Sequence, residues 1–316
     1  PLLDGTLPDG SRINATFTKD VTSRGPTFSI RKFTETPWTP TQLIAMRTLS
    51  PEMLAYFWLL IEHKSNILMT GATASGKTTL LNAIAFFIPP EARIVSIEDT
   101  REVNLPKENW LPAVARTSIG VGKIGEVDLF ALLKNSFRQN PDYVIVGEVR
   151  GKEAFVLFQG MASGHSSLST IHADSVDTLI RRLQTPPIEL SPTLINSLDC
   201  VAIATHTIVK GQDTRRIREI VEIININKDG TALINTPFIW NPAEDKFYFK
   251  KQSKVFEKIS IRSGIPVEKL YQEFMIRAKL LYTLYTKQVF SFDEVGKLIN
   301  DYYKNPVEVL NKYNVQ

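Results

Sequence analysis

The stretch TGATASGKTTLL, residues 70–81, directly follows the apolar run at positions 67–69. Its segment GATASGKT, residues 71–78, matches the pattern G-x-x-x-x-G-K-[ST] and stands between a strand-like and a helix-like run, as a phosphate-binding loop must. Small side chains leave room for backbone N–H groups to converge on phosphate oxygens. The residues expected around the phosphates are Gly71, Ala72, Thr73, Ala74, Ser75, Gly76, Lys77, Thr78 and Thr79.

This loop predicts ATP and Mg²⁺ as ligands. Lys77 would reach the β- and γ-phosphates, and the Thr78 hydroxyl would bind Mg²⁺. A helix over residues 77–87, ended by two prolines, would add the positive end of its dipole. A GTPase would need N-K-x-D, whereas residues 227–230 read NKDG and indicate a turn. An ordinary glycine-rich turn is the alternative, and the full match disfavours it.

Length and composition indicate a folded protein of about two domains, with 316 residues and 43% hydrophobic content. Its formal charge of +4 suits an anionic ligand, a membrane surface or nucleic acid without choosing among them. The only cysteine, Cys200, cannot form an intrachain disulfide, so we expect a reducing cytoplasm. The apolar stretch at 53–61 is too short to span a membrane. Because the chain opens at Pro1 with sequence typical of a domain interior, we expect a missing upstream part.

Hydrophobic periodicity predicts the organisation of the chain. Alternating residues at 11–17 and 27–33 predict a strand pair, so residues 1–33 form a first region. The proline-marked segment 34–40 is interpreted as a linker, and its end carries helix-starting signals.

The rest of the chain has two regions. Residues 41–205 alternate β-branched runs with helical stretches, which predicts an α/β core with a parallel sheet and helices on both faces. Residues 206–316 predict an extension of strands followed by amphipathic helices. The helical tail is expected to pack on the core or on a partner.

Acidic residues end two of the predicted core strands. Glu98 follows the run at 94–97, and Glu148 follows the run at 143–146 as in a Walker B segment. Carboxylates at strand ends near Lys77 are candidates for activating the attacking group. Each taken alone could instead be a solvated strand end.

Two of the four histidines, His165 and His172, lie close together in the sequence. Seven positions apart on a strand, they would point to opposite faces, and no cysteine is near, so we do not predict a zinc site. The simpler alternative is a single buried, hydrogen-bonded histidine.

Four ordered segments carry a family resemblance. GATASGKT (71–78), IEDTRE (97–102), NPDYVIVGEVRG (140–151) and ASGHSSLSTIHADS (162–175) resemble the Walker A, Asp box, Walker B and His box of the type II/type IV secretion ATPase superfamily. GPTFSIRKF (25–33) resembles the archaeal branch, which includes archaellum motor and archaeal pilus or secretion ATPases. Ala72 and Ala74 depart from the family, which often has Pro and Gly at these loop positions.

The resemblance implies a homo-hexamer with a RecA-like core after a partial N-terminal α+β domain. It implies that Glu98 activates water, that Thr78 and Glu148 lie at the metal, and that His172 senses the γ-phosphate. His165 is a weaker candidate than His172. An arginine of the N-terminal region would reach nucleotide from a neighbouring subunit, and the candidates are Arg31, then Arg12 and Arg24.

The implied function is ATP hydrolysis coupled to assembly of a type IV pilus-like filament or to protein secretion. The implied partner is a polytopic membrane platform protein, so the chain would lie in the cytoplasm, peripheral at the inner face of the cell membrane. The sequence leaves the machine open among archaellum, pilus, secretion and DNA uptake.

Two rival functions make other demands on the sequence. A small-molecule kinase would not need the His box. A RecA-like nucleic-acid translocase of a conjugation or DNA-transfer system is the stronger rival, since hexameric RecA-like motors also pull DNA and this chain is basic. Nucleic acid is nevertheless an unlikely partner, because no stretch combines clustered Lys and Arg with aromatic residues. The short basic runs at 181–182 and 214–216 are interpreted as solvated faces.

Overall fold

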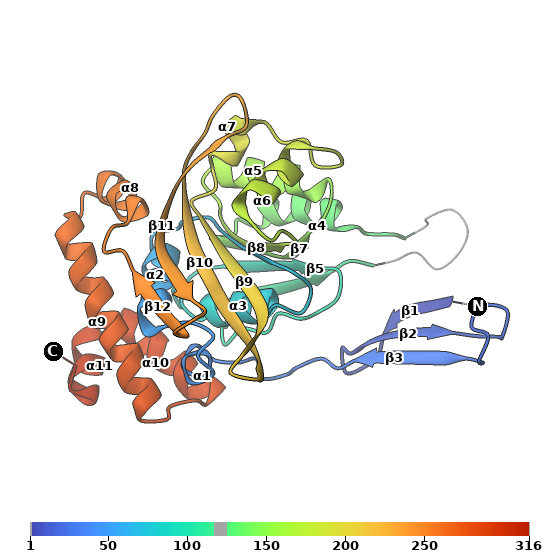
Figure 1. Ribbon diagram of the computed structural model, residues 1–316, viewed down its shortest axis with the longest axis horizontal. Coiled ribbons are helices and arrows are strands. Elements are labelled where there is room, and N and C mark those ends of the chain that lie inside the picture. The colour runs from blue at the N-terminus through green and yellow to red at the C-terminus, as the bar shows by residue number, and fades with distance from the viewer. Residues whose placement is uncertain (1, 117–124, 316) are drawn as a thin grey trace.

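The computed structural model describes residues 2–116 and 125–315. Its centre is a nine-stranded sheet with the order β12-β11-β10-β9-β4-β8-β7-β5-β6 (Figure 1). The six strands from β9 to β6 run parallel to their neighbours. They are β4 (Ile67–Gly71), β5 (Ile94–Glu98), β6 (Trp110–Val114), β7 (Tyr143–Val149), β8 (Ser166–Ile171) and β9 (Cys200–Val209). The α/β prediction with a parallel sheet is confirmed.

Apolar side chains cover both faces of this sheet. On β7, Tyr143 and Ile145 belong to one hydrophobic cluster, whereas Val144 and Val146 belong to another. The strand therefore reads as a continuous apolar run, as expected when both faces are buried. The helices and the one 3₁₀ turn between the parallel strands are α3 (Lys77–Ala85), α4 (Leu129–Ser136), η1 (Phe137–Gln139), α5 (Glu153–Ala162), α6 (Val176–Gln184) and α7 (Pro192–Ile195).

The strands of the C-terminal extension belong to the same sheet as the core. β10 (Gln212–Ile226), β11 (Ala232–Asn241) and β12 (Lys246–Phe249) add to it antiparallel, starting from β9. The expected boundary between residues 205 and 206 falls inside β9 and needs correction. The alternation of residues predicts each strand but not its pairing partner. The sequence therefore did not predict that these strands join the core sheet.

The C-terminal helices pack on the helices that precede β4. The buried face of α9 shares one hydrophobic cluster with α2, as the tail prediction expected. The helices of this layer are α1 (Pro40–Ala45), α2 (Pro51–Glu62), α8 (Lys254–Ser263), α9 (Val267–Thr286), α10 (Phe292–Lys304) and α11 (Pro306–Tyr313). The helix-starting signals are confirmed, since Thr39 forms a capping box with Gln42 and Ser50 caps α2. No helix in the described ranges is long and apolar enough to cross a membrane.

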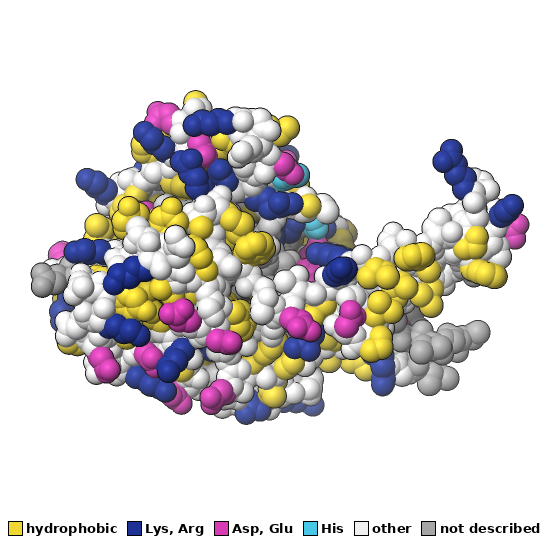
Figure 2. Space-filling view, turned by 90° about the horizontal axis from the view of Figure 1, so that it is seen from below, with side chains coloured by type: hydrophobic (Ala, Val, Ile, Leu, Met, Phe, Trp, Pro, Cys, Tyr) yellow, Lys and Arg dark blue, Asp and Glu magenta, His cyan; other side chains and the backbone are white. Residues whose placement is uncertain are grey.

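A small antiparallel sheet projects from the body at the N-terminal end (Figure 1). The predicted strand pair is confirmed as β2 (Arg12–Thr16) and β3 (Thr27–Arg31), and β1 (Leu2–Thr6) adds a third strand. The register places Phe28 and Ile30 on one face and Arg31 on the other. Hydrophobic side chains gather along this arm (Figure 2), and Phe28 is 73% exposed.

One core strand was not expected from the sequence. β6 contains Pro112, which lacks the N–H that a central strand would need. The structure places β6 at the end of the sheet, where it pairs with β5. A proline is acceptable there because, within the described residues, no strand pairs with the other side of β6.

Candidate nucleotide-binding site

The loop between β4 and α3 has the backbone shape that its glycines allow. Gly71 has a φ of +148°, and a Cβ on it would lie 2.2 Å from the carbonyl oxygen of Ala204. Gly76 has a φ of +95° and forms the N-cap of α3. Ala74 also has a positive φ, +60°, although it carries a Cβ. The loop therefore opens toward the N-terminus of α3, where backbone N–H groups are free to meet an anion.

The side chain of Lys77 folds back over this loop. Its Nζ donates to the carbonyl oxygens of Gly71 at 3.1 Å and Ala72 at 2.9 Å. Burial lowers the pKa of Lys77, although the nearby carboxylates of Glu148 and Glu102 oppose this. The ammonium group thus lies partly desolvated at the position where a phosphate would meet the loop.

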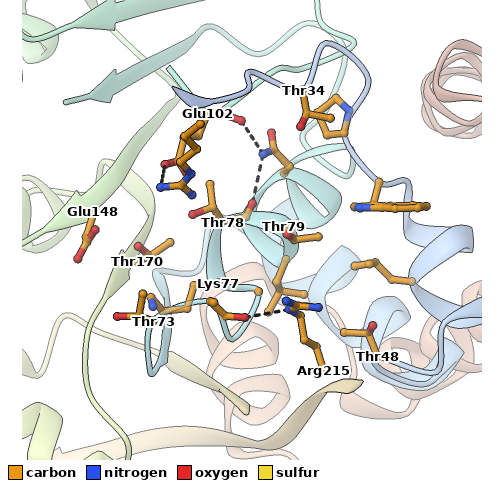
Figure 3. Close-up of a pocket in the computed structure, with 18 of the residues that line it drawn as sticks. Thr34, Thr48, Thr73, Lys77, Thr78, Thr79, Glu102, Glu148, Thr170 and Arg215 are labelled. Atoms are coloured by element: carbon orange, nitrogen blue, oxygen red, sulfur yellow. Dashed lines mark hydrogen bonds and ion pairs between the residues drawn. The ribbon is translucent and has the colours of Figure 1, made fainter. Parts of the chain in front are cut away.

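A cavity of about 760 Å³ surrounds the loop (Figure 3). Its lining comes from the N-terminal sheet, the linker, the loop itself, the ends of β7 and β8, and β10. Pro37, Trp38 and Met46 give one part an apolar wall, whereas Lys77 and Glu148 lie in a polar part. An apolar wall beside a phosphate-binding loop fits a ligand with both a base and phosphates.

Glu148 and His172 form a charged cluster with Lys77 and Arg150. The Oε2 of Glu148 accepts a hydrogen bond from Arg150 at 2.6 Å, and its Oε1 lies 2.9 Å from Nε2 of His172. The Nδ1 of His172 lies 3.4 Å from Nζ of Lys77. Burial alone would raise the pKa of Glu148, but the hydrogen bond and charge of Arg150, with His172 and Lys77, lower it.

The surroundings of His172 favour its neutral form. Burial, followed by the charge of Lys77, lowers the pKa of His172, although the charge of Glu148 opposes this. A neutral ring has one donor and one acceptor, so Nδ1 accepts from Lys77 while Nε2–H faces Glu148. His172 thus connects the loop lysine to the acid at the end of β7.

Glu98 does not face the cavity, contrary to the expectation from the sequence. Its carboxylate is buried, and Oε1 accepts from the backbone N–H groups of Glu102 and Val103, both at 2.9 Å. Burial raises the pKa of Glu98 to about 7, although these two hydrogen bonds oppose the rise. Glu102, in the same Asp box segment, lines the cavity instead. Spacing from the strand end could not decide between them, because the turn after β5 reverses the chain.

The N-terminal arginines differ in their positions. Nη1 of Arg31 lies 2.9 Å from Oε1 of Glu102 in the same chain, and both residues line the cavity. Arg12 also lines the cavity and pairs with Asp4. Arg24 lies in the β2–β3 connection, at the opposite end of these strands, and is not among the lining residues.

His165 is not brought to the site. Its ring packs edge-on against Phe137, with ring centroids 4.8 Å apart. The two histidines therefore have separate surroundings, one apolar and one charged. In the described part of the chain, no three His, Cys, Asp or Glu side chains converge to hold a metal ion.

Four cavity arginines were not identified from the sequence: Arg101, Arg150, Arg215 and Arg216. Arg150 lies within the Walker B segment quoted above and could have been noticed. Arg215 lines the cavity from β10, and Arg216 is buried against Asp245, so the run at 214–216 is not simply a solvated face. No local signal indicates this, because the position of β10 depends on its pairing with β9.

Comparison with known proteins decides the family. The model for the Type II/IV secretion system protein family matches residues 1–210. The chain belongs to this family. The resemblance to type II/type IV secretion proteins noted from the four motifs is therefore confirmed.

Relatives match this type II/IV secretion system protein over different fractions of its length. Protein MJ1287 of Methanocaldococcus jannaschii is 43% identical over 83% of this chain and 97% of that relative. Protein MJ0900 of the same organism is 39% identical over 98% of this chain, which spans only 57% of that relative. The conjugal transfer protein TrbB of Rhizobium radiobacter is 30% identical, and the match covers 71% of this chain and 68% of TrbB.

A solved structure shows that the fold recurs. The pilus retraction motor PilT, crystallised with ADP, has a TM-score of 0.50 and 16% identity, covering 95% of this chain and 77% of that one. At this identity the likeness concerns the fold alone.

Proposed function

We propose that this secretion-family protein hydrolyses ATP with Mg²⁺. The observation that carries the proposal is a single cavity in which a phosphate-binding loop, Lys77, and the carboxylates of Glu102 and Glu148 meet. Charge grows on the γ-phosphate and the leaving oxygen during phosphoryl transfer, and Lys77 would stabilise it. To do so, its ammonium group exchanges the carbonyl oxygens of Gly71 and Ala72 for phosphate oxygens.

The residues present fit a magnesium ion. Mg²⁺ prefers oxygen ligands and is usually held by few protein groups together with phosphates and water. The Thr78 hydroxyl and the Glu148 carboxylate, which both line the cavity, are oxygen donors of this kind and would hold it. The ion would neutralise charge on the β- and γ-phosphates.

We assign the activation of water to Glu102. Its carboxylate faces the cavity, where it can accept a proton from an attacking water. Glu98 acts through it as a positioning residue, because its Oε1 holds the backbone N–H of Glu102. Arg31 pairs with Glu102 and brings a positive charge toward the γ-phosphate.

His172 would report the state of the γ-phosphate. Its ring lies between Lys77 and Glu148, so movement of either group changes its hydrogen bonds. A neutral histidine can exchange these partners without the cost of moving a buried charge.

The proposed work is assembly of a type IV pilus-like filament, such as an archaellum or pilus, or protein secretion. Membership of the Type II/IV secretion system protein family supports this use of ATP. We propose a homo-hexamer that acts on a polytopic membrane platform protein. The chain would thus lie in the cytoplasm at the inner face of the membrane.

Transfer of nucleic acid is a second candidate. It is favoured by the 30% identity with TrbB, which is named as a conjugal transfer protein. DNA-stimulated hydrolysis with salt-dependent DNA binding would support this candidate, whereas hydrolysis indifferent to DNA would support the filament or secretion function.

Replacement of Lys77 tests the proposed activity. Lys77→Ala should reduce ATP hydrolysis to background while the melting temperature stays within a few degrees, since the side chain serves the ligand rather than the core. Lys228→Ala, in the exposed β10–β11 turn, is the matched control and should hydrolyse ATP like the unmodified protein. Equal turnover in Lys77→Ala and the control would refute the proposal.

A further inference from the structure

Arg215 reaches the phosphate-binding loop from a strand far along the chain. Its Nε donates a hydrogen bond to the carbonyl oxygen of Ala74 at 2.8 Å, across 141 positions. A Cβ on Gly76 would lie 3.5 Å from Cδ of Arg215. The side chain therefore runs along the loop where it enters α3, and Figure 3 shows its guanidinium beneath that point.

The neighbouring residue anchors the strand that presents Arg215. Arg216 is 4% exposed, and its Nε and Nη2 bond to the two carboxylate oxygens of Asp245 at 2.9 and 3.2 Å. Trp240 donates to the same carboxylate at 3.0 Å. Successive side chains of a strand point to opposite faces, so fixing Arg216 on one face leaves Arg215 on the other, where it meets the loop.

The loop residue that Arg215 holds has an unusual backbone. Ala74 has a φ of +60°, a region that residues with a Cβ seldom adopt. The hydrogen bond from Arg215 fixes the direction of its carbonyl and thereby favours this conformation over extended ones. A glycine at this position would adopt the same φ without such help.

The charge of Arg215 is also available to a ligand. Arg12, Arg31 and Arg150 each pair with a carboxylate, whereas among residues 2–116 and 125–315 Arg215 has no ion-pair partner. In Figure 3, Arg215 and Thr79 lie on the side of the loop away from Glu148.

We propose that Arg215 is a positioning residue for nucleotide, which holds the phosphate-binding loop in its binding shape through the carbonyl of Ala74. Its guanidinium adds a positive charge beside the phosphates from β10. The inference rests on the proposed function, because it takes a nucleotide as the ligand of the cavity. It also makes the antiparallel extension of the sheet part of the site.

The test measures binding of a fluorescent, non-hydrolysable ATP analogue with Mg²⁺ to the full chain. Arg215→Gln should raise the dissociation constant about tenfold, the factor expected for loss of one charge-assisted hydrogen bond. Ala74→Gly should restore binding in the double variant to within about threefold of the unmodified protein, because glycine needs no support at this φ. Arg181→Gln, an exposed arginine of α6, removes the same charge and should change nothing.

Melting curves without nucleotide confirm that each variant is folded. Unchanged affinity in Arg215→Gln, or a double variant as weak as Arg215→Gln alone, would overturn the inference. In both cases binding by the unmodified protein would leave the proposed function standing. Failure of the unmodified protein to bind the analogue would overturn both.

Discussion

Glu98 and Glu102 are four positions apart, yet their carboxylates have different surroundings. The side chain of Glu98 is buried beneath a turn, whereas that of Glu102 lines the cavity beside Arg31. A carboxylate that takes a proton from water must reach the water. We therefore propose Glu102, rather than the strand-end acid Glu98, as the general base.

Amide substitutions separate these two roles. Glu102→Gln should lower kcat for ATP by about 10² to 10³, with nucleotide affinity nearly unchanged, since the amide cannot take a proton. Glu98→Gln retains an oxygen that can accept the two backbone N–H groups, so we expect a loss of about tenfold or less. Steady-state hydrolysis and analogue binding measure both. A larger loss of kcat in Glu98→Gln than in Glu102→Gln would instead identify Glu98 as the general base.

Burial of Glu98 also predicts a dependence of stability on pH. The pKa of Glu98 is about 7 in the fold, above the ordinary value of 4.5. Below pH 4.5 both folded and unfolded states hold the proton, so the fold carries no penalty from this group. As the pH rises from 4.5 to 7, Glu98 ionises in the unfolded state while it stays mostly protonated in the folded state. The free energy of unfolding therefore falls by on the order of 3 kcal/mol.

Denaturant unfolding between pH 5 and 8 checks this prediction. The free energy of unfolding should fall with pH in the unmodified protein and should fall less steeply in Glu98→Gln, which cannot ionise. Equal slopes in the two proteins would show that Glu98 does not have the raised pKa.

At the scale of elements, the segment after Glu102 connects the site to the C-terminal helices. Lys107 donates to the backbone oxygen of Ile88 and to Asn300 of α10, and burial lowers the pKa of Lys107 to about 7. One helical turn earlier, Gly296 faces Pro106 so closely that a Cβ would lie 2.8 Å from Cβ of the proline. The helix and the segment are therefore in direct contact at two successive turns of α10.

Gly296→Ala tests this close packing. Alanine usually stabilises a helix relative to glycine, but here its methyl group meets Pro106, so we expect a net loss of about 1 to 3 kcal/mol. Lys297→Ala, the exposed next residue, should be neutral. Thermal or denaturant unfolding measures both. A gain in stability for Gly296→Ala would show that α10 can move away without cost.

For the whole molecule, the question is which subunit of the proposed hexamer supplies Arg31 to a given nucleotide. The family resemblance led us to expect action across a subunit boundary, and the alternation of β3 frees the arginine from the core. The structure shows that Arg31 pairs with Glu102 of its own chain. We therefore expect it to act on the nucleotide of its own subunit.

Mixed assemblies decide this point. Lys77→Ala and Arg31→Ala proteins, each inactive, should remain inactive after mixing, because every subunit then lacks one essential group of its own site. Size-exclusion chromatography with differently tagged chains must show that the two co-assemble. Partial return of ATP hydrolysis would demonstrate that a neighbouring subunit provides the arginine.

The sequence alone determined the parts of this protein that depend on neighbouring residues. The loop at 71–78 needs glycines at Gly71 and Gly76 for backbone reasons, and both lie where the motif places them. The apolar runs of β5 and β7 identified buried parallel strands, and Thr39 identified a helix start. These features are local, so the residues that encode them stand next to each other.

Only the tertiary structure decided which distant groups share the cavity. Arg215 meets Ala74 because β10 pairs with β9, and β9 pairs with the strand that carries the loop. Glu102 replaces Glu98 in the cavity because the turn after β5 reverses the chain. Pairing between strands depends on the packing of the whole sheet. Many residues distant in the sequence contribute to the free energy of that packing, so no short segment predicts it.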